Sequence, residues 1–476
     1  MTAVPAILGG EPVRSDPWIV GPMIDEAEKS MLLRALEEHN FSRYVGSAGP
    51  DIDAVLEMTS EAASRVDAPW HFLGGPNVRM FAHEFAERFD VPYAIPINAA
   101  TSGLSVAIGA VGIEPGDEVI LPAISFSASA MAPLLFGGIP VFADVDAETF
   151  CISPASFEAA ITDRTRAVIV VHLAGNICDM GRIMELAQRR GIAVIEDAAQ
   201  AIGGEWQGKK AGTIGDAGVF SFQQSKNITT GEGGMIVTHS PAIARKCRLI
   251  MNHGEALMED YHSDEDLMNV AGLNCRLPEL CAAIGRAQLA KLDTVNAIRT
   301  QNADLLCEGL KDLPGLNIPA PQRDTDNAVD VPHMFVAKYD EAAMGFPRSL
   351  FVSALGAEGV PVGTGYTRTM YANPNLRRKI VFGSKGFPWK IGDVVNPVSY
   401  EDGICPVAER LLEEEFLWFY HIAHPSTEQD MADVINAVKK VVENRTDIAA
   451  AQDRLSNMHA ENVQGRLDVL RKADEK

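Results

Sequence analysis

The feature that most constrains this chain is a regular alternation of helical and strand patterns, which begins near residue 78 and continues to residue 238. Short apolar runs bounded by turn residues are typical of buried strands, and the segments between them have helical spacing. Parallel strands need such crossover segments, because a tight hairpin joins only antiparallel strands. The alternation therefore predicts an α/β fold, with a mostly parallel central sheet flanked by helices on both faces.

The expected elements follow one another closely in this region. Strands are expected at Tyr93–Ile97, Glu118–Leu121, Pro140–Asp144, Ala167–His172, Ala193–Glu196, Gly218–Phe222 and Met235–Thr238. Helices are expected at Val78–Phe89, Ser102–Val111, 127–136, Asp179–Arg190 and 241–251. A long helix should begin at Pro278, because proline in the first helical turn costs no hydrogen bond.

The rest of the chain predicts further parts. Residues 1–75 are expected to form an N-terminal arm, with a helix at Glu26–Glu38 and an insertion at 46–72. We expect a large domain at 76–305, a smaller C-terminal α/β domain at 306–445, and a helical or frayed tail at 446–476. A chain of 476 residues is long enough for this division.

Composition argues against several classes of partner. The formal net charge of −23 at pH 7 disfavours nucleic acid and anionic membranes, since both need a basic surface. The chain has no apolar run of about 18 residues, and Met1–Arg14 lacks a signal-peptide pattern. Its seven cysteines are scattered and form no CxxC pair, which predicts reduced thiols without a disulfide framework or a metal site. We therefore expect a cytoplasmic protein with no nucleic-acid or membrane partner.

The stretch from 192 to 238 carries the candidate chemistry. One apolar strand ends at Ile195 and is followed by Glu196 and Asp197 at its carboxyl end, where α/β sheets bind ligands. A second strand ends shortly before Lys226, which precedes the sequence GEGG. Pyridoxal phosphate (PLP) needs such a pair, because an acid keeps its ring nitrogen protonated and a lysine forms an imine with its aldehyde. Taken alone, each residue is more often an ordinary surface residue.

Several ordered motifs around these residues resemble the DegT/DnrJ/EryC1/StrS family of sugar aminotransferases, which are fold-type-I PLP enzymes. The motifs are GDEVILPAISFSAS (116–129), PVFADVD (140–146), VHLAGNICDM (171–180), DAAQ (197–200), GDAGVFSFQQSK (215–226), GEGGM (231–235), NHGE (252–255), GLNCRLPELCAAIGRAQL (272–289) and CPVAERL (405–411). The likeness extends over most of the chain and leaves out about the last 30 residues. It implies the fold-type-I architecture, with the smaller α/β domain after the large one.

The resemblance implies a role for eight residues. Lys226 is the Schiff-base lysine, and Asp197 pairs with the pyridinium nitrogen. The other implied cofactor-binding residues are Gln200 beside the ring oxygen O3′, Phe126 stacked on the ring, Thr101, Ser102 and Ser221 at the phosphate, and Asn274, which reaches the phosphate from the neighbouring subunit. Free N–H groups at the start of a helix also suit a phosphate. We therefore expect a homodimer with shared active sites, PLP or its amine form (PMP) as cofactor, and no metal.

The supporting residues have other interpretations. Phe126 suits a core position, Thr101 and Ser102 suit helix caps, Ser221 suits a strand interior, and Asn274 suits a turn. The family pattern is also broken in two places, because Ala99-Ala100 replaces Ser-Gly before the threonine and Cys275 replaces a tyrosine. His172 and His253 lie in family-like motifs, but we expect core or supporting roles for them.

The expected activity is transfer of an amino group from glutamine or glutamate to a keto-sugar or keto-cyclitol. The segment 405–421 and the chain length favour the branch that acts on cyclitols and antibiotic sugars. In the segment 360–375, Tyr366, Tyr371 and Asn373 are candidates for substrate hydroxyls, whereas Arg276 or Arg368 would bind a carboxylate or a phosphate. One alternative is a PLP- or PMP-dependent sugar dehydratase, which Lys226 disfavours because such relatives can carry histidine there. The other is a non-catalytic PLP-binding regulator, which would usually add a DNA-binding domain or lose the lysine.

Overall fold

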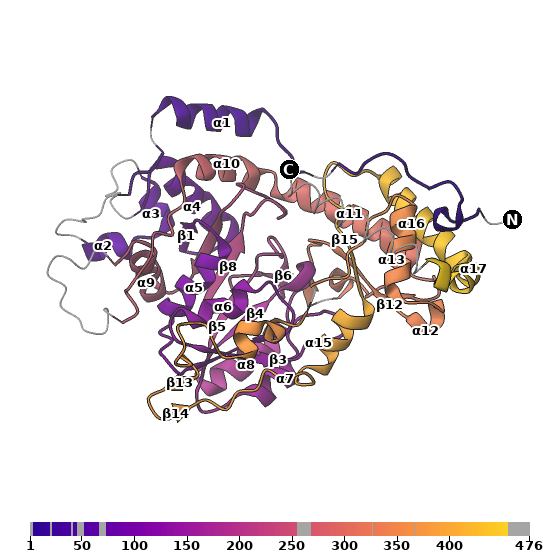
Figure 1. Ribbon diagram of the computed structural model, residues 1–476. Coiled ribbons are helices and arrows are strands. Elements are labelled where there is room, and N and C mark those ends of the chain that lie inside the picture. Colours follow the sequence, from indigo (N-terminus) through magenta and orange to yellow (C-terminus); the bar gives the residue numbers. More distant parts are fainter. Residues whose placement is uncertain are drawn as a thin grey trace, which may run out of the picture.

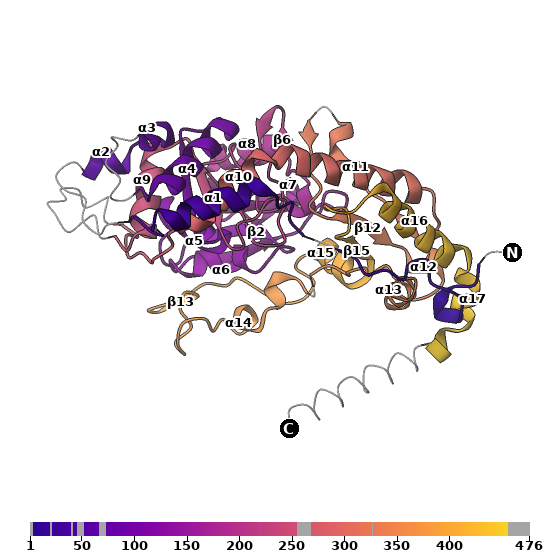
Figure 2. The same ribbon diagram turned by 90° about the horizontal axis from the view of Figure 1, so that it is seen from above.

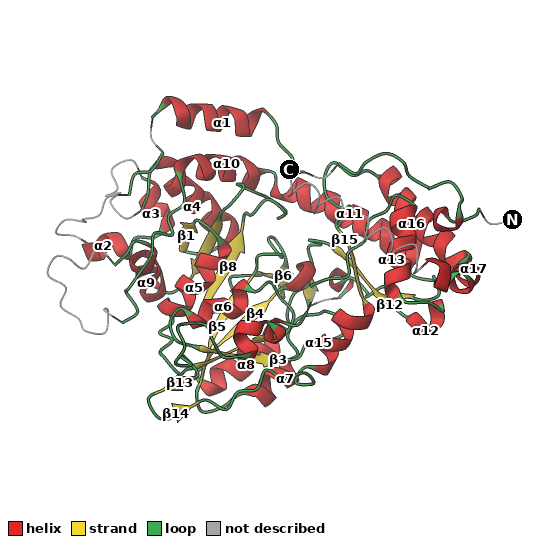
Figure 3. Ribbon diagram, in the orientation of Figure 1, coloured by secondary structure: helices red, strands yellow, loops and turns green. Residues whose placement is uncertain are grey.

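The computed structural model describes residues 3–19, 21–39, 41–44, 52–65, 73–254, 268–325, 327–366 and 368–455. A seven-stranded sheet forms the larger of its two units (Figure 3), in the order β1-β9-β8-β5-β4-β2-β3. The strands are β1 (Tyr93–Ile97), β2 (Glu118–Pro122), β3 (Ile139–Ala143), β4 (Thr165–Val171), β5 (Ala193–Asp197), β8 (Ala217–Ser221) and β9 (Gly234–Thr238). Only β9 runs antiparallel to its neighbours in this sheet. The predicted α/β fold with a mostly parallel sheet is confirmed.

Helices cover both faces of this sheet, because its apolar side chains alternate between the faces. On one face, Ile195 and Val219 pack in a cluster with α5 (Ala100–Ala110), α6 (Ala128–Leu134) and α9 (Pro241–Met251). On the other face, Val194 and Phe220 pack with α4 (Pro76–Phe89), α7 (Pro154–Ala160), α8 (Met180–Arg190) and α10 (Glu279–Ala290). Consecutive residues at a strand end therefore point to opposite faces, which decides the role of two neighbouring acids below.

A smaller unit surrounds the three-stranded antiparallel sheet β10-β12-β15 (Figure 1). Its strands are β10 (Leu316–Asn317), β12 (Phe335–Tyr339) and β15 (Phe416–Phe419), and its main helices are α11 (Leu292–Leu310), α13 (Arg348–Ala357) and α16 (Glu428–Glu443). One apolar cluster joins these elements. Helix α11 follows α10 almost directly and connects the two units (Figures 1 and 2).

The N-terminal arm lies against both units. At its start, the backbone N–H groups of Ala6 and Val13 donate to the Glu358 carboxylate at 2.7 and 3.0 Å. Further along, α1 (Glu26–Glu37) packs on α10, where Nζ of Lys291 lies 2.7 Å from a carboxylate oxygen of Glu28. The helix predicted at 26–38 is confirmed, and the arm passes from the small unit to the large one (Figure 1).

Residues 370–403 pack on the large unit, although they lie in the range predicted for the small domain. Tyr400 accepts from Nε1 of Trp389 at 2.9 Å and donates to the Pro140 carbonyl at 2.7 Å. Met370 N–H donates to the Ala123 carbonyl at 2.9 Å. This segment contains η6 (Met370–Ala372), α14 (Pro374–Arg377), β13 (Lys390–Ile391) and β14 (Val394–Val395). It extends the wall of the large unit next to Tyr366.

The remaining elements are short. They are η1 (Ala6–Leu8), α2 (Ile52–Leu56), α3 (Ser60–Ser64), η2 (Leu173–Gly175), β6 (Glu205–Trp206), β7 (Lys209–Lys210), η5 (Gln322–Asp324), β11 (Ala328–Val329), α12 (Glu341–Met344), α15 (Pro406–Arg410), the π-helix η7 (Leu411–Glu415) and α17 (Arg445–Ala450). Within the expected insertion at 46–72, residues 52–65 are described and contain two short helices, whereas 46–51, 66–72 and the tail beyond 455 lie outside the described residues. None of the described helices has the length and apolar character that crossing a bilayer requires.

Candidate active site

The predicted site residues come mainly from one edge of the large sheet. Parallel strands present their carboxyl ends together, and ligands of α/β proteins bind there. At this edge β1 leads into Thr101 and Ser102, β2 leads to Phe126, β5 ends at Asp197, and β8 ends at Ser221 before Lys226. The fold therefore brings together residues that are up to 125 positions apart in the sequence, as between Thr101 and Lys226.

Asp197 is buried and only partly satisfied by hydrogen bonds. Its carboxylate accepts from the Ser129 hydroxyl at 2.9 Å and from the Ala199 N–H at 3.2 Å. Burial raises the pKa of the Asp197 carboxyl, and these two donors together with the nearby charge of Lys226 oppose the increase. A cationic group placed beside Asp197 would relieve the cost of this buried charge.

The neighbouring acid, Glu196, faces the other side of the sheet and is fully engaged. The His172 side chain lies within hydrogen-bond distance, with Nε2 3.0 Å from Oε2 of Glu196. Because Nδ1 of His172 accepts from the Cys178 N–H at 3.1 Å, we assign the ring proton to Nε2. Glu196 also accepts from the backbone N–H groups of Gly212, Ile214 and Gly215 at 2.6–2.8 Å. His172 and Glu196 therefore hold a loop in place, in agreement with the supporting role expected for His172.

Lys226 lines a cavity of about 380 Å³, which is large enough for a small substrate. The cavity lies between the loop 223–227, helix α11, residues 420–424 and the arm at Gly21–Met23. Burial lowers the pKa of Lys226, while the charge of Asp197 opposes this effect and that of Arg299 adds to it. A lowered pKa makes the neutral, nucleophilic form of the amine more accessible near neutral pH.

Gln200 connects the sheet edge to the segment that precedes α14. Its Oε1 accepts from the Ala174 N–H at 2.8 Å, and its Nε2 donates to the Tyr366 hydroxyl at 2.8 Å. Tyr366 is thus positioned at the predicted site. Two other candidates from this segment have structural contacts instead, since the Tyr371 hydroxyl bonds to Glu409 and Asn373 accepts from the Asn375 N–H. Thr367, a further hydroxyl of the segment 360–375, lies outside the described residues.

The first turn of α5 is available to an anion. Ala99 is the N-cap residue, no side chain caps this helix, and no acid lies in its first turn, so the interpretation of Thr101 and Ser102 as caps is wrong. Gly234 of β9 lies against this turn, since a Cβ placed on it would come within 2.9 Å of the Ala100 nitrogen. Unpaired N–H groups at such a position suit a phosphate.

Two of the predicted residues lie at the surface of the protomer. Phe126 is 62% exposed, so its interpretation as a core residue is wrong. Asn274 is exposed as well, and its Oδ1 accepts from Nε of Arg276 at 2.9 Å. This contact satisfies Asn274 within its own chain, whereas its role across a subunit boundary stays a prediction. Cys275, which replaces the family tyrosine, is buried beside the Ser102 hydroxyl.

Sequence reasoning missed three residues around the site. Ser129 bonds to Asp197 from α6, and its own position in the motif SFSAS was the only signal. Arg299 of α11 and His333 before β12 lie near Lys226. Burial and the positive charges of Lys226 and Arg299 hold the pKa of His333 well below its usual range. Arg299 and His333 reach the site through tertiary packing, and no motif marked them.

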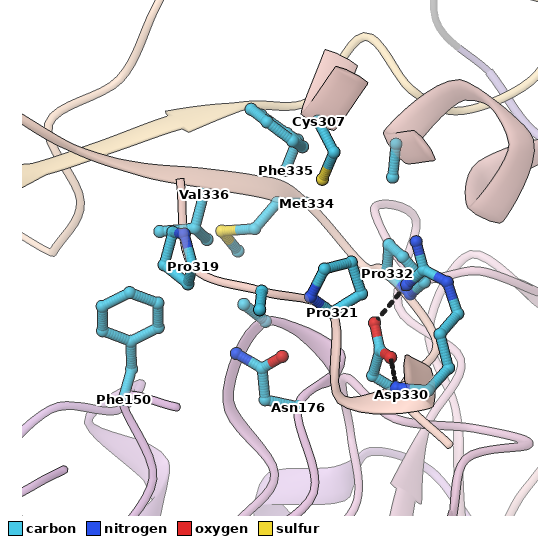
Figure 4. A pocket seen from close by; sticks show the side chains of 14 residues that line it. Phe150, Asn176, Cys307, Pro319, Pro321, Asp330, Pro332, Met334, Phe335 and Val336 are labelled. Carbon is cyan, nitrogen blue, oxygen red and sulfur yellow. Dashed lines mark hydrogen bonds and ion pairs between the residues drawn. The ribbon is translucent and has the colours of Figure 1, made fainter. Parts of the chain in front are cut away.

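A second cavity lies where the segment 319–336 meets the large unit (Figure 4). Phe150 and Asn176 of the large unit form one side, and Pro319, Pro321 and Val336 lie opposite. Its volume is only about 50 Å³, and its main charged groups, Arg323 and Asp330, are paired with each other at 2.6 Å. This cavity is too small for a sugar-sized substrate, and of the two cavities only the one at Lys226 contains predicted site chemistry.

Comparison with known proteins agrees with this geometry. The model of the DegT/DnrJ/EryC1/StrS aminotransferase family matches residues 55–387, which confirms the resemblance found in the motifs. L-glutamine:2-deoxy-scyllo-inosose aminotransferase of Streptomyces kanamyceticus is 33% identical over 457 residues, covering 94% of this chain and 98% of the relative. Spore coat polysaccharide biosynthesis protein SpsC of Bacillus subtilis is 34% identical over 393 residues, covering 81% and 94%.

Solved structures give the same result for the fold. The crystal structure of DesI in the presence of its TDP-sugar product superposes with a TM-score of 0.73 at 27% identity. The match covers 95% of this chain and 98% of DesI. A match over 95% of the chain takes in both units, so their fold is shared with a solved protein.

Proposed function

This chain belongs to the DegT/DnrJ/EryC1/StrS aminotransferase family, and from this premise we propose that it transfers the amino group of L-glutamine to a ketone carbon of a cyclitol. The observation that carries the proposal is that a buried acid, Asp197, and a partly buried amine of lowered pKa, Lys226, lie close enough at one edge of the sheet for their charges to interact. Perturbed groups that interact in this way are typical of catalytic sites.

The described residues fit PLP, on which enzymes of this family generally depend. Asp197 suits the protonated ring nitrogen, because it is buried and accepts only two hydrogen bonds. The uncapped start of α5, with Thr101 and Ser102, suits the phosphate, and Ser221 lies at the end of the adjacent strand β8. Phe126 offers an exposed aromatic face for the ring, and Gln200 lies beside the site. These residues would hold the cofactor, and Lys226 would hold it covalently.

The cofactor, when bound, supplies an electron sink that stabilises negative charge at the carbon bearing the amine. The protein's own groups do the rest. Asp197 holds a proton on the ring nitrogen, because its carboxylate is favoured next to a positive charge. Nζ of Lys226 moves a proton between carbon atoms, and its lowered pKa keeps a fraction of it neutral for this task. The Ser129 hydroxyl orients Asp197.

Two observations support a cyclitol acceptor. The relative from Streptomyces kanamyceticus, named for a deoxy-inosose substrate, is covered nearly from end to end, more fully than the polysaccharide protein SpsC. The Tyr366 hydroxyl, held by Gln200, lies where it can meet a ring hydroxyl. A dehydratase and a regulator are less well supported, since the relatives with this coverage are aminotransferases and Lys226 is present.

We also propose that the working unit is a cytoplasmic homodimer, in which Asn274 contacts the cofactor phosphate of the partner subunit. The exposure of Asn274, of its neighbour Leu273 at 62%, and of Phe126 supports a contact surface at the site. Activity measured during dilution to low nanomolar concentration should fall as the dimer dissociates. A fully active monomer would contradict the shared site.

A kinetic comparison of acceptors tests the proposed function. With L-glutamine as donor, kcat/KM should be higher for a keto-inositol than for any nucleotide-linked keto-sugar or 2-oxo acid in the same panel. If pyruvate or oxaloacetate is aminated as efficiently as the best keto-inositol or keto-sugar, the assignment of a polyol acceptor is wrong.

A further inference from the structure

Arg299 is a buried cation for which the described residues supply no acidic partner. It is 4% exposed, and its Nη1 donates to the His333 carbonyl at 2.8 Å. Its Nε has no hydrogen-bond partner among the residues that the structure describes. Burial lowers the pKa of Arg299 to about 10, with only Tyr420 opposing this decrease. A guanidinium in such surroundings is costly unless an anion pairs with it.

Arg299 lines the same cavity as Lys226. The other lining residues are Gly21, Pro22, Met23, Gln223, Gln224, Ser225, Asn227, Val295, Tyr420, Ala423 and His424. This lining contains one lysine and one arginine, Lys226 and Arg299, and neither aspartate nor glutamate. The cavity is therefore suited to an anionic ligand whose other groups are neutral and polar.

We propose that Arg299 binds the α-carboxylate of the amino donor, and that the preferred donor carries a single carboxylate. This inference rests on the proposed aminotransferase function. Because Lys226 is committed to the cofactor, Arg299 is the one strongly basic group of the lining left to bind an anion. Its guanidinium is a planar fork that matches the geometry of a carboxylate.

The neutral part of the lining accounts for the choice of donor. The amides of Gln223 and Gln224 and the hydroxyl of Ser225 belong to lining residues that directly precede Lys226 in the chain. The side-chain amide of glutamine can exchange hydrogen bonds with such groups. The second carboxylate of glutamate would meet no cation there, and its desolvation would be uncompensated. The lining thus favours glutamine over glutamate.

The test compares L-glutamine with L-glutaminol, which has CH₂OH in place of the carboxylate. In the parent enzyme, kcat/KM for the donor half-reaction should be about 100-fold higher with glutamine, since a hydrogen bond to a charged group contributes up to about 3 kcal/mol. In Arg299→Gln, this preference should fall to within about threefold. Arg299→Lys, which keeps the charge but loses the fork, should retain a preference of about tenfold.

Three controls separate donor binding from other roles. The acceptor half-reaction, started from the PMP-loaded variant with a keto-inositol, should stay within about tenfold of the parent, because that ketone has no carboxylate. Cofactor affinity should be unchanged in a PLP titration of the Arg299→Gln apoprotein. Arg286→Gln is the matched substitution outside the site, since Arg286 is paired with Glu84 at 2.7 Å, and it should keep the full preference for glutamine.

Each contrary outcome has a distinct meaning. Loss of PLP affinity in Arg299→Gln would make Arg299 a cofactor ligand, and equal losses with glutamine, glutaminol and the ketone would make it structural. Either result overturns the inference, as does a preference for glutamine that persists in the variant. If the parent enzyme itself aminates no ketone of the panel, the proposed function fails instead, and the inference fails with it.

Discussion

Glu196 and Asp197 are neighbours at the end of β5, yet the two sides of the sheet give their carboxylates opposite tasks. On one side, Glu196 accepts four hydrogen bonds, from the His172 ring and from backbone N–H groups of the loop 212–215. On the other side, Asp197 accepts two, and burial raises its pKa. The strand's alternation alone separates these environments, because consecutive side chains point to opposite faces.

The difference teaches how a structural acid and a functional acid are told apart. A carboxylate with all its acceptor positions filled by fixed N–H donors has nothing left to offer a ligand. A buried carboxylate with few donors is destabilised until a cationic group arrives, and the protein tolerates that cost only where binding compensates for it. Glu196 therefore has a structural role, and Asp197 is the acid that we propose for the cofactor.

On the side of the sheet that carries Asp197, the largest effect on turnover is expected from Lys226→Ala. Turnover should fall on the order of 10⁴-fold or more, because in our proposal one amine both holds the cofactor and moves the proton. The purified variant should lack the visible absorption of lysine-bound cofactor but unfold at a similar temperature to the parent apoprotein. Turnover within tenfold of the parent would show that Lys226 has no role in the mechanism, and the side of the sheet that carries Asp197 would then not be the catalytic one.

Asp197→Asn should give the next largest effect. The variant should still bind PLP, but the half-reaction with glutamine should slow by about 100-fold, because a neutral amide cannot hold the ring proton as a carboxylate does. Stopped-flow absorbance with the donor measures this rate. An unchanged rate would mean that another acid serves the ring nitrogen.

On the structural side, Glu196→Gln should lower the free energy of unfolding by about 3 kcal/mol or more. The amide replaces one acceptor oxygen with an NH₂ group, which leaves at least one of the four N–H donors unpaired. Urea unfolding at a fixed PLP concentration measures the loss. Specific activity of the folded fraction should stay within tenfold of the parent. A large loss of activity without loss of stability would mean that Glu196 is the functional acid and Asp197 the structural one.

The smallest effect expected is on the stability of the apoprotein as pH changes. Because the folded pKa of Asp197 is raised, its favourable contribution is fully present below the unfolded pKa, about 3.8, and is lost as pH rises through the folded pKa. Apo Asp197→Asn should therefore be more stable than the parent apoprotein at neutral pH, by about 1–3 °C in Tm, and this advantage should vanish near pH 4. An apo variant that is less stable than the parent at pH 7 would show that Asp197 stabilises the fold as Glu196 does.

Much of the sheet could be predicted from sequence, and the reason is local. Strand β1 matches its predicted bounds, since an apolar run between turn residues identifies a buried strand without help from the rest of the chain. The segment 370–403 was not anticipated, because its aromatic residues Trp389 and Tyr400 become ordered only by packing on the large unit. Helix α5 begins at Ala100, two residues earlier than predicted, since small residues give no periodic signal there.

The same distinction applies to the site. Asp197 ends one buried strand and Lys226 comes five residues after the end of another, so that the strand ends and the family motifs predicted that they would meet. Arg299 and His333 come from the connection and the small unit, and neither strand pattern nor motif placed them beside Lys226. Glu196 and Asp197 were adjacent candidates, and only the hydrogen bonds of the folded chain assign different tasks to them.

The transfer of labelled nitrogen tests the central claim most directly. The enzyme would be incubated with PLP, L-glutamine labelled with nitrogen-15 at its α-amino group, and 2-deoxy-scyllo-inosose, and the cyclitol product analysed by mass spectrometry. The account predicts an aminocyclitol that carries the label, no label when only the side-chain amide of glutamine is labelled, and no product with Lys226→Ala. An unlabelled cyclitol amine, or label that enters pyruvate in preference to the cyclitol when both are present, would contradict it.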